Sequence, residues 1–257
     1  MPQPSPVVLL EHVDRVFGKE PNRTVALQDV NLAVAAGELV TLIGPSGCGK
    51  STLLRIVGDL LPPTRGAVRV NGKTAHQARL DRDYGIVFQS PVLFEWRSVR
   101  ANVELPLEVI GTPSAERHRR AGELLDLVEL GEFESHYPWQ LSGGMQQRAA
   151  IARALALRPS LLLMDEPFGA LDELTRERMN GELLNLAQKT ATTVLFVTHS
   201  IPEAVFVSTR VAVMTPRPGR ILETIDIDLP QPRGLETREL ARYFELVTRV
   251  RESLRKG

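Results

Sequence analysis

The stretch from residue 44 to residue 52 combines glycines, hydroxyl side chains and a lysine at a spacing that suits phosphate chemistry. It reads Gly44, Pro45, Ser46, Gly47, Cys48, Gly49, Lys50, Ser51 and Thr52. Glycines leave the backbone free to turn, so that successive N–H groups converge on phosphate oxygens. Lys50 supplies a positive charge for the β- and γ-phosphates, and Ser51 offers a hydroxyl ligand to Mg²⁺. The pattern predicts a phosphate-binding P-loop in preference to a glycine turn without a ligand.

A second pair of chemically useful residues, Asp165 and Glu166, ends the apolar run of residues 161–164. Asp165 lies where it can hold Mg²⁺ through water. Glu166, one residue further on, points differently and could polarise a water aimed at the γ-phosphate. An acidic pair at a strand end is, on its own, often only the start of a loop. The upstream P-loop favours the functional interpretation of both carboxylates.

The elements that must position these groups alternate along the chain. A strand-like run of residues 38–43 precedes the P-loop, and a helix-like run of residues 53–57 follows it, so the positive end of a helix dipole points at the anion. Other short apolar runs, typical of buried strands, lie at residues 84–88, 161–164, 193–197 and 211–214. Because such runs alternate with helical stretches, the sequence predicts an α/β fold with a parallel sheet covered on both faces.

The rest of the chain predicts smaller β elements before this sheet and helices inside it. Two short strands at residues 7–16 and 26–34 are joined by a polar turn at residues 18–24, and Asn71-Gly72 is typical of a hairpin. Helices are expected to start at Thr112-Pro113 and to span residues 144–158. We therefore expect one domain over residues 1–257, divided into a core (1–89 and 159–230), a helical lobe (90–158) and a C-terminal helical tail (231–257).

Composition limits the class of protein. The 31 basic and 31 acidic side chains balance, so no overall positive field favours nucleic acid, and no apolar run reaches the roughly 18 residues that would cross a bilayer. The first ten residues lack the features of a signal peptide, so we expect a cytosolic protein. Cys48 is the only cysteine. A helix N-terminus and Lys50 should favour its thiolate, although a small side chain that merely fits the loop is the preferred interpretation.

Residues 141–145, Leu-Ser-Gly-Gly-Met, resemble the LSGGQ signature of ABC ATPases, with Met145 in the place of the usual glutamine. Ser142, Gly143 and Gly144 would form a second anion-binding helix terminus. The resemblance covers nearly the whole chain. It implies a P-loop NTPase core, an N-terminal antiparallel β subdomain, an inserted helical lobe, and ATP and Mg²⁺ as ligands. It also implies a head-to-tail dimer, in which each signature closes over the nucleotide on the partner's P-loop.

Other positions match the family in order. Gln89 corresponds to the Q-loop glutamine, which reaches Mg²⁺ and the attacking water, and His199 to the switch histidine that bonds the γ-phosphate. Asp172 belongs to the D-loop, which crosses the dimer interface. Phe17, with Val25 close by, corresponds to the aromatic that stacks on adenine, although an aromatic here fills a core as often as it stacks.

Three classes of ABC protein carry such motifs: a transporter motor, a soluble protein of DNA repair or translation, and a regulator without turnover. Repair relatives place a very long coiled coil between the P-loop and the signature, and the segment between them here is too short to hold one. Translation relatives carry two cassettes in one chain, whereas this sequence shows one. A regulator would have a damaged catalytic set. The transporter motor is preferred, because Lys50, Gln89, Asp165, Glu166 and His199 are all present. A free-standing cassette resembles a bacterial importer subunit on the cytoplasmic face of the inner membrane. It would work with separate permease subunits and, indirectly, a solute-binding protein.

The segment from Gln89 to Val103 resembles the nitrate/sulfonate/taurine importer group, and so does the stretch of residues 229–233. Leu93, Phe94 and Trp96 form an apolar cluster there, which would meet a permease helix or fill the lobe's own core. The tail, with Leu240, Tyr243, Phe244, Val247, Val250 and Leu254, predicts an amphipathic helix. Packing on its own domain is preferred for this helix, with membrane lipid facing its basic residues as the alternative.

Overall fold

The computed structural model describes residues 5–19 and 21–257. Residues 1–4 of the N-terminal stretch and Glu20 of the expected turn lie outside the described residues. Among the described elements, one sheet has four strands in the order β2-β1-β4-β5, all neighbours antiparallel. It contains β1 (Val8–Phe17), β2 (Thr24–Val34), β4 (Arg65–Val70) and β5 (Lys73–Thr74). The expected hairpin at Asn71-Gly72 joins β4 to β5, with Val70 paired to Lys73.

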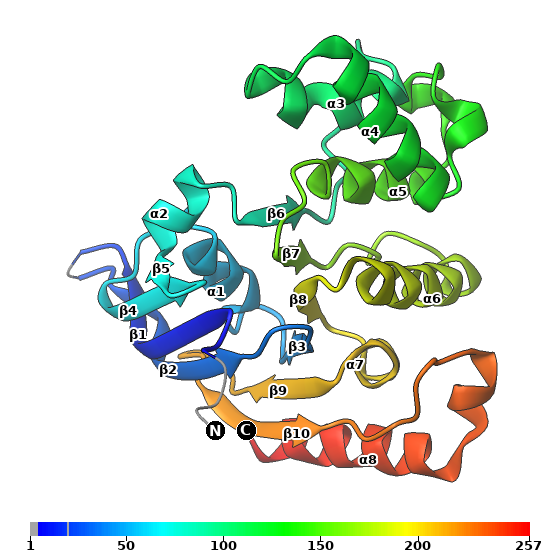
Figure 1. Ribbon diagram of the computed structural model, residues 1–257. Helices are drawn as coiled ribbons and strands as arrows, with labels where there is room; N and C mark the ends of the chain where they lie inside the picture. The colour runs from blue at the N-terminus through cyan, green and yellow to red at the C-terminus, as the bar shows by residue number, and fades with distance from the viewer. Residues whose placement is uncertain (1–4, 20) are drawn as a thin grey trace.

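The second sheet carries the central layer of the molecule (Figure 1). Its order is β10 (Ile221–Asp226), β9 (Arg210–Met214), β3 (Leu39–Ile43), β8 (Thr193–Thr198), β7 (Leu161–Asp165) and β6 (Tyr84–Val87). All neighbours are parallel except β10, which runs antiparallel to β9. The residues of β3, β7 and β8 are all buried, which explains their continuous apolar runs. The expected P-loop α/β fold and antiparallel β subdomain are confirmed.

Strand β10 was not expected from the sequence. Its residues alternate between exposed and more buried positions, because it lies at the edge of the sheet. Continuous apolar runs mark strands that are buried on both faces, and an edge strand of alternating exposure does not have this pattern.

The helices fall into two groups in Figure 1. Helices α1 (Lys50–Val57), α6 (Glu173–Thr190) and α7 (Ile201–Val207) flank the large sheet, and α2 (Ala75–Leu80) lies by the small one. Helices α3 (Val99–Val109), α4 (Ser114–Leu127) and α5 (Gly143–Ala154) gather at the top of the view. Three short 3-10 turns are also present in the described chain, η1 (Gly131–Phe133), η2 (Pro138–Gln140) and η3 (Leu235–Glu239).

Two helix boundaries differ from expectation. Helix α4 begins at Ser114, so Pro113 takes the N-cap position and Thr112 lies outside the helix. Helix α5 ends at Ala154, four residues before Arg158. The guanidinium of Arg120 donates to the carbonyl oxygens of Leu155 and Ala156, which are thereby held in a turn.

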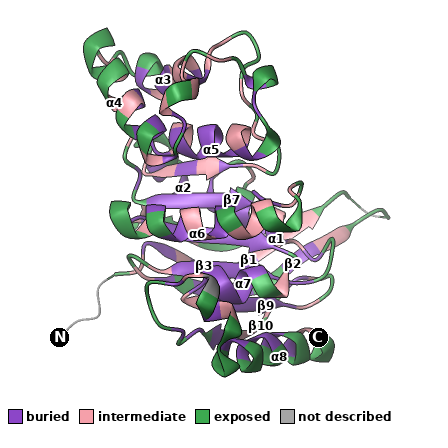
Figure 2. Cartoon of the chain, turned by 90° about the vertical axis from the view of Figure 1, so that its right-hand side faces the viewer, coloured by how far each residue is buried: buried purple, intermediate pink, exposed green. Residues whose placement is uncertain are grey.

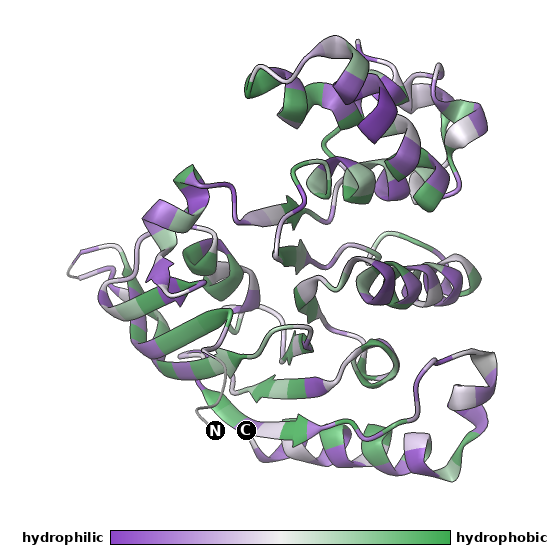
Figure 3. Cartoon of the chain, in the orientation of Figure 1, coloured by the Kyte–Doolittle hydropathy of each residue, from purple (hydrophilic) through white to green (hydrophobic). Residues whose placement is uncertain are grey.

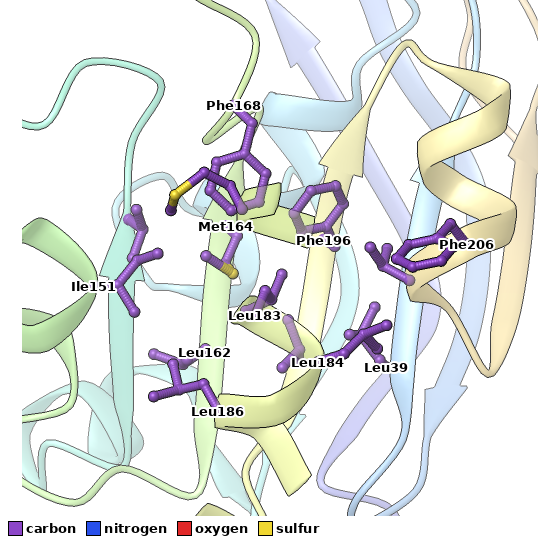
Figure 4. Close-up of a cluster of buried hydrophobic side chains, with 14 of the residues drawn as sticks. Leu39, Ile151, Leu162, Met164, Phe168, Leu183, Leu184, Leu186, Phe196 and Phe206 are labelled. Atoms are coloured by element: carbon purple, nitrogen blue, oxygen red, sulfur yellow. The ribbon is translucent and has the colours of Figure 1, made fainter. Parts of the chain in front are cut away.

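The core joins the helical group to the sheet. Figure 2 shows the strands as a buried centre with exposed helix faces outside. In Figure 4, Ile151 of α5 lies in one apolar cluster with Leu162 of β7 and Leu186 of α6. This shared cluster fixes the signature helix against the strand that ends in the acidic pair.

The tail forms α8 (Ala241–Lys256), which packs against α7, β9 and β10 (Figure 1). Figure 3 shows hydrophilic and hydrophobic residues alternating along it. Tyr243, Val247 and Val250 are buried, so the expectation that the helix packs on its own domain is confirmed. Phe244 and Leu240, expected on the same apolar face, are exposed. Within the described residues, no helix combines the length and apolar character needed to cross a membrane.

Candidate nucleotide-binding site

An open cavity lies over the N-terminus of α1. The residues lining it are Phe17, Thr24, Ala26, Ser46, Gly47, Gly49, Lys50, Ser51, Thr52, Glu166 and Arg217. Six of these belong to the predicted P-loop, and Phe17 and Glu166 were also predicted. The tertiary structure therefore assembles predicted groups from three distant parts of the sequence around one space.

The P-loop backbone depends on glycine at Gly47 and Gly49, whose φ angles of 74° and 109° lie in the left-handed region. A β-carbon on Gly49 would also lie 2.6 Å from Leu27 Cδ2, in β2. Gly49 occupies the N-cap of α1 and has no side chain to accept from the first-turn N–H groups. Those N–H groups are therefore available to an anion in the cavity.

Lys50 is buried inside the loop. Its Nζ donates to the carbonyl oxygens of Gly44 and Pro45 at 2.8 and 3.1 Å. These bonds hold the ammonium at the centre of the loop, next to the N–H groups that would meet phosphate.

Cys48 corrects an expectation. Its side chain is buried, and this burial raises the pKa of the thiol against the lowering effect of Lys50. The position beside Lys50 had suggested a favoured thiolate, but the raised pKa favours the neutral thiol. The structure agrees with the preferred interpretation, a small side chain that fits the loop.

The predicted magnesium ligands Ser51 and Asp165 meet directly. Ser51 Oγ, at the start of α1, donates to Asp165 Oδ1, at the end of β7, over 2.6 Å. The carboxyl ends of parallel strands share one edge of a sheet, which brings the P-loop after β3 to the acidic pair after β7. Hydroxyl and carboxylate oxygens are the ligands that Mg²⁺ prefers, so this pair fits the ion.

Glu166 and His199 form a second pair at the same edge. His199 Nδ1 lies 2.9 Å from Glu166 Oε2. Gln89 approaches them through Gly169: a β-carbon on Gly169 would lie 3.4 Å from Gln89 Nε2 and 3.6 Å from Glu166 Oε2. Gln89 is exposed and does not line the cavity. Gln89 was expected to reach both Mg²⁺ and the attacking water. It lies near Glu166, the residue expected to activate that water, and outside the Ser51–Asp165 pair expected to hold Mg²⁺.

Phe17 also lines the cavity and is 38% exposed. The guanidinium carbon of Arg15 lies 4.6 Å from the centre of the Phe17 ring. Val25 does not line the cavity, whereas Thr24 and Ala26 do. Successive residues of β2 face opposite sides of the sheet, so the wall is built by the neighbours of the residue that was predicted.

The signature residues lie elsewhere. Ser142 is the N-cap of α5, with its Oγ accepting from Met145 N at 3.3 Å, and Ser142 and Gly143 are exposed. None of residues 142–145 lines the cavity. In Figure 1, α5 lies with the helical group, away from α1.

Asp172 caps α6. Its Oδ1 accepts from Thr175 N at 3.0 Å, and the pKa of the carboxyl is lowered by this backbone hydrogen bond.

Helix α5 is tied to the segment that carries Gln89. The side-chain amide of Gln147 donates to the carbonyl oxygen of Phe88 at 3.0 Å. The guanidinium of Arg153 donates to the carbonyls of Pro91 and Val92 at 3.0 and 2.8 Å. The signature helix and the Q-loop segment are therefore one hydrogen-bonded unit, which sequence motifs alone did not indicate.

Comparisons with known proteins agree with this geometry. The ABC transporter family matches residues 27–169. An uncharacterized ABC transporter ATP-binding protein of Methanocaldococcus jannaschii is 48% identical over 94% of this chain and 90% of its own length. A taurine import ATP-binding protein of Rhizobium johnstonii is 48% identical over 85% and 83% of the two chains.

A solved dimeric ATP-binding cassette, in a post-hydrolysis state with ADP and Pi, superposes with a TM-score of 0.75 at 37% identity, over 89% of this chain and all of that one. The chain belongs to the ABC transporter family. It is an ATP-binding cassette, an ATPase of the class that its P-loop, acidic pair and signature predict.

Proposed function

We propose that this chain is the ATP-hydrolysing motor subunit of a bacterial-type ABC importer. The convergence of Ser51 with Asp165, and of Glu166 with His199, at one edge of the sheet carries the ATP-hydrolysing part of the proposal. Relatives named as taurine import ATP-binding proteins support an importer and suggest a sulfonate-type cargo. The alternatives in DNA repair or translation receive no support from these relatives.

The predicted residues in and around the cavity receive separate roles. The P-loop N–H groups and Lys50 bind the phosphates, and Phe17 stacks on adenine. Ser51 and Asp165, with Gln89 approaching from outside the cavity, would hold Mg²⁺, which neutralises phosphate charge when bound.

The Glu166 carboxylate orients and polarises the attacking water. Its partner His199 fixes the direction of that carboxylate and reaches the γ-phosphate.

A second copy of the chain completes the site. Because residues 142–145 do not line the cavity of their own chain, we propose that they close over the nucleotide of a partner in a head-to-tail dimer, with Asp172 at the interface. Two structural relatives are described as dimers, which supports the pairing of two copies. Residues 90–158 would then act as the moving lobe, set against a core of residues 1–89 and 159–230.

Permease subunits at the cytoplasmic face of the inner membrane are the proposed membrane partners, with a solute-binding protein acting through them. Phe94 and Trp96, 37% and 75% exposed, pack ring to ring at 4.9 Å, while Leu93 packs into the core. Asn102 is buried, and its side-chain amide accepts a hydrogen bond from Phe94 N and donates one to Phe94 O. The backbone of Phe94 is therefore fixed, and aromatic residues are common anchors of binding surfaces.

ATP binding by the Lys50→Ala variant tests the nucleotide site. Loss of the central ammonium should weaken ATP affinity by more than about tenfold, because a charge-assisted contact to phosphate is removed. Equilibrium binding of ATP to the isolated subunit measures the change. Arg55→Ala, on the exposed side of α1, is the matched control and should bind normally. An affinity within about threefold of wild type would contradict the role given to Lys50.

A further inference from the structure

The cavity contains a cationic side chain that no motif indicates. Arg217 lies in the loop between β9 and β10, 170 residues from the P-loop glycine that it touches. Its Nε and Nη2 donate to the carbonyl oxygen of Gly47 at 3.3 and 3.1 Å. A guanidinium has five N–H donors in a planar fork, so two bonds to a single carbonyl leave others for a ligand.

The loop that carries Arg217 is fixed against the P-loop. Gly219 N donates to Ala26 O in β2 at 2.9 Å, and Thr215 Oγ1 donates to Pro218 O at 3.0 Å. A β-carbon on Gly219 would lie only 2.0 Å from the carbonyl oxygen of Cys48. Only glycine permits this approach, so the loop packs directly against the P-loop backbone and holds Arg217 at the rim of the cavity.

We propose that Arg217 is an additional phosphate-binding residue of the nucleotide site. The proposal rests on the function proposed above. Among the side chains that line the cavity, Lys50 and Arg217 are the cations and Glu166 is the anion. A triphosphate brings several negative charges, and a guanidinium is the side chain best suited to grip phosphate oxygens in pairs. The bonds to Gly47 hold the fork in place before the nucleotide arrives.

ATP and adenosine titrations of Arg217→Gln test the proposal, with Arg220→Gln as the matched control. Arg220 belongs to the same loop and is exposed, but it bonds Gln28 and does not line the cavity. We expect about tenfold weaker ATP binding for Arg217→Gln and no change for Arg220→Gln. Adenosine, which has no phosphate, should bind both variants like wild type. Higher salt should narrow the ATP difference.

Three results would overturn the proposal. The first is equal ATP affinity in the two variants, and the second is an equal loss of affinity for ATP and for adenosine in Arg217→Gln. The third is a nucleotide-free Arg217→Gln protein that unfolds at a lower temperature than both wild type and Arg220→Gln. The second result would make Arg217 a contact of the nucleoside, and the third would make it a residue that stabilises the loop. Arg217→Lys keeps the charge and should retain intermediate ATP affinity, which covers the case of a glutamine variant that does not fold. Wild-type protein that fails to bind ATP would instead refute the proposed function.

Discussion

At the scale of single residues, the site is built from short polar contacts between distant parts of the chain. Ser51 meets Asp165 across 114 positions, and Glu166 meets His199 across 33. The φ angle of Glu166 is 46°, a left-handed conformation that is uncommon for a residue with a side chain. Such backbone outliers cluster at functional sites, because the surrounding structure must hold them in place.

Glu166→Gln should bind Mg·ATP normally and hydrolyse it very slowly. The amide keeps the shape of the side chain but loses the charge that polarises water, and general-base catalysis contributes about 10²–10⁴-fold. Phosphate release measures turnover, and size-exclusion chromatography with ATP should show a trapped dimer. Glu173→Gln, in the first turn of α6, serves as a control for loss of one nearby acidic charge. Normal turnover with only monomer present would exclude Glu166 as the catalytic carboxylate.

At the scale of elements, the segments around the site are tied to one another rather than merely adjacent. Gln147 and Arg153 of α5 hold the carbonyls on either side of the Q-loop. On the other flank, Glu203 in the first turn of α7 accepts from Thr198 Oγ1 at the end of β8, one residue before His199. A buried carboxyl thus fixes the segment from which the switch histidine projects.

Glu203 should make stability depend on pH. Burial raises the pKa of this carboxyl above its ordinary 4.5, in spite of Thr198 and Arg176. The native state then holds its proton longer than the unfolded chain does. Its contribution is complete below pH 4.5 and is lost as pH rises through the raised pKa.

Glu203→Gln removes this titration, so the unfolding temperature of the variant relative to wild type should be higher at about pH 8 than at about pH 4. Thermal unfolding at the two pH values measures the difference. The exposed Glu116→Gln variant should show no such change. A pH-independent difference for Glu203→Gln would mean that its pKa is not raised.

At the scale of the whole molecule, two exposed surfaces of the described residues suggest contacts with other chains. The exposed N-terminus of α5, with Ser142 and Gly143, does not line the cavity of its own chain. The pair of Phe94 and Trp96 remains exposed although Asn102 fixes the backbone beneath it. We assign the first surface to a second copy and the second to a permease.

Mixing Ser142→Arg with Lys50→Ala tests the head-to-tail dimer. Each variant alone should fail to close on ATP. In a mixed dimer both changes fall in one composite site, so the other site keeps an intact P-loop and an intact signature. ATP-driven closure restored on mixing, followed by light scattering, is the expected outcome. Defective closure in the mixture, with ATP binding by Ser142→Arg intact, would count against a site shared between chains.

Trp96→Ala should weaken assembly with the permease subunits while leaving ATP affinity unchanged. An exposed aromatic anchor is removed, and such residues carry about 2 kcal/mol or more of binding energy at hot spots. Trp139 is the matched control, because it is 69% exposed in the 3-10 turn η2, also in the helical group. Co-purification with the membrane subunits measures assembly. Wild-type yield for both Trp96→Ala and Phe94→Ala would remove this surface from the coupling scheme.

The sequence by itself determined the P-loop, the acidic pair and the signature, because each depends on the order of neighbouring residues and on the backbone that they allow. It also indicated the buried parallel strands, whose continuous apolar runs reflect burial on both faces. Only the tertiary structure decided which side chains complete the cavity. Arg217 and Thr24 belong to no motif, and they reach the P-loop through strand pairing and a glycine that packs against Cys48. The pKa of Cys48 was likewise set by burial, a quantity that arises from packing among distant segments and has no local pattern.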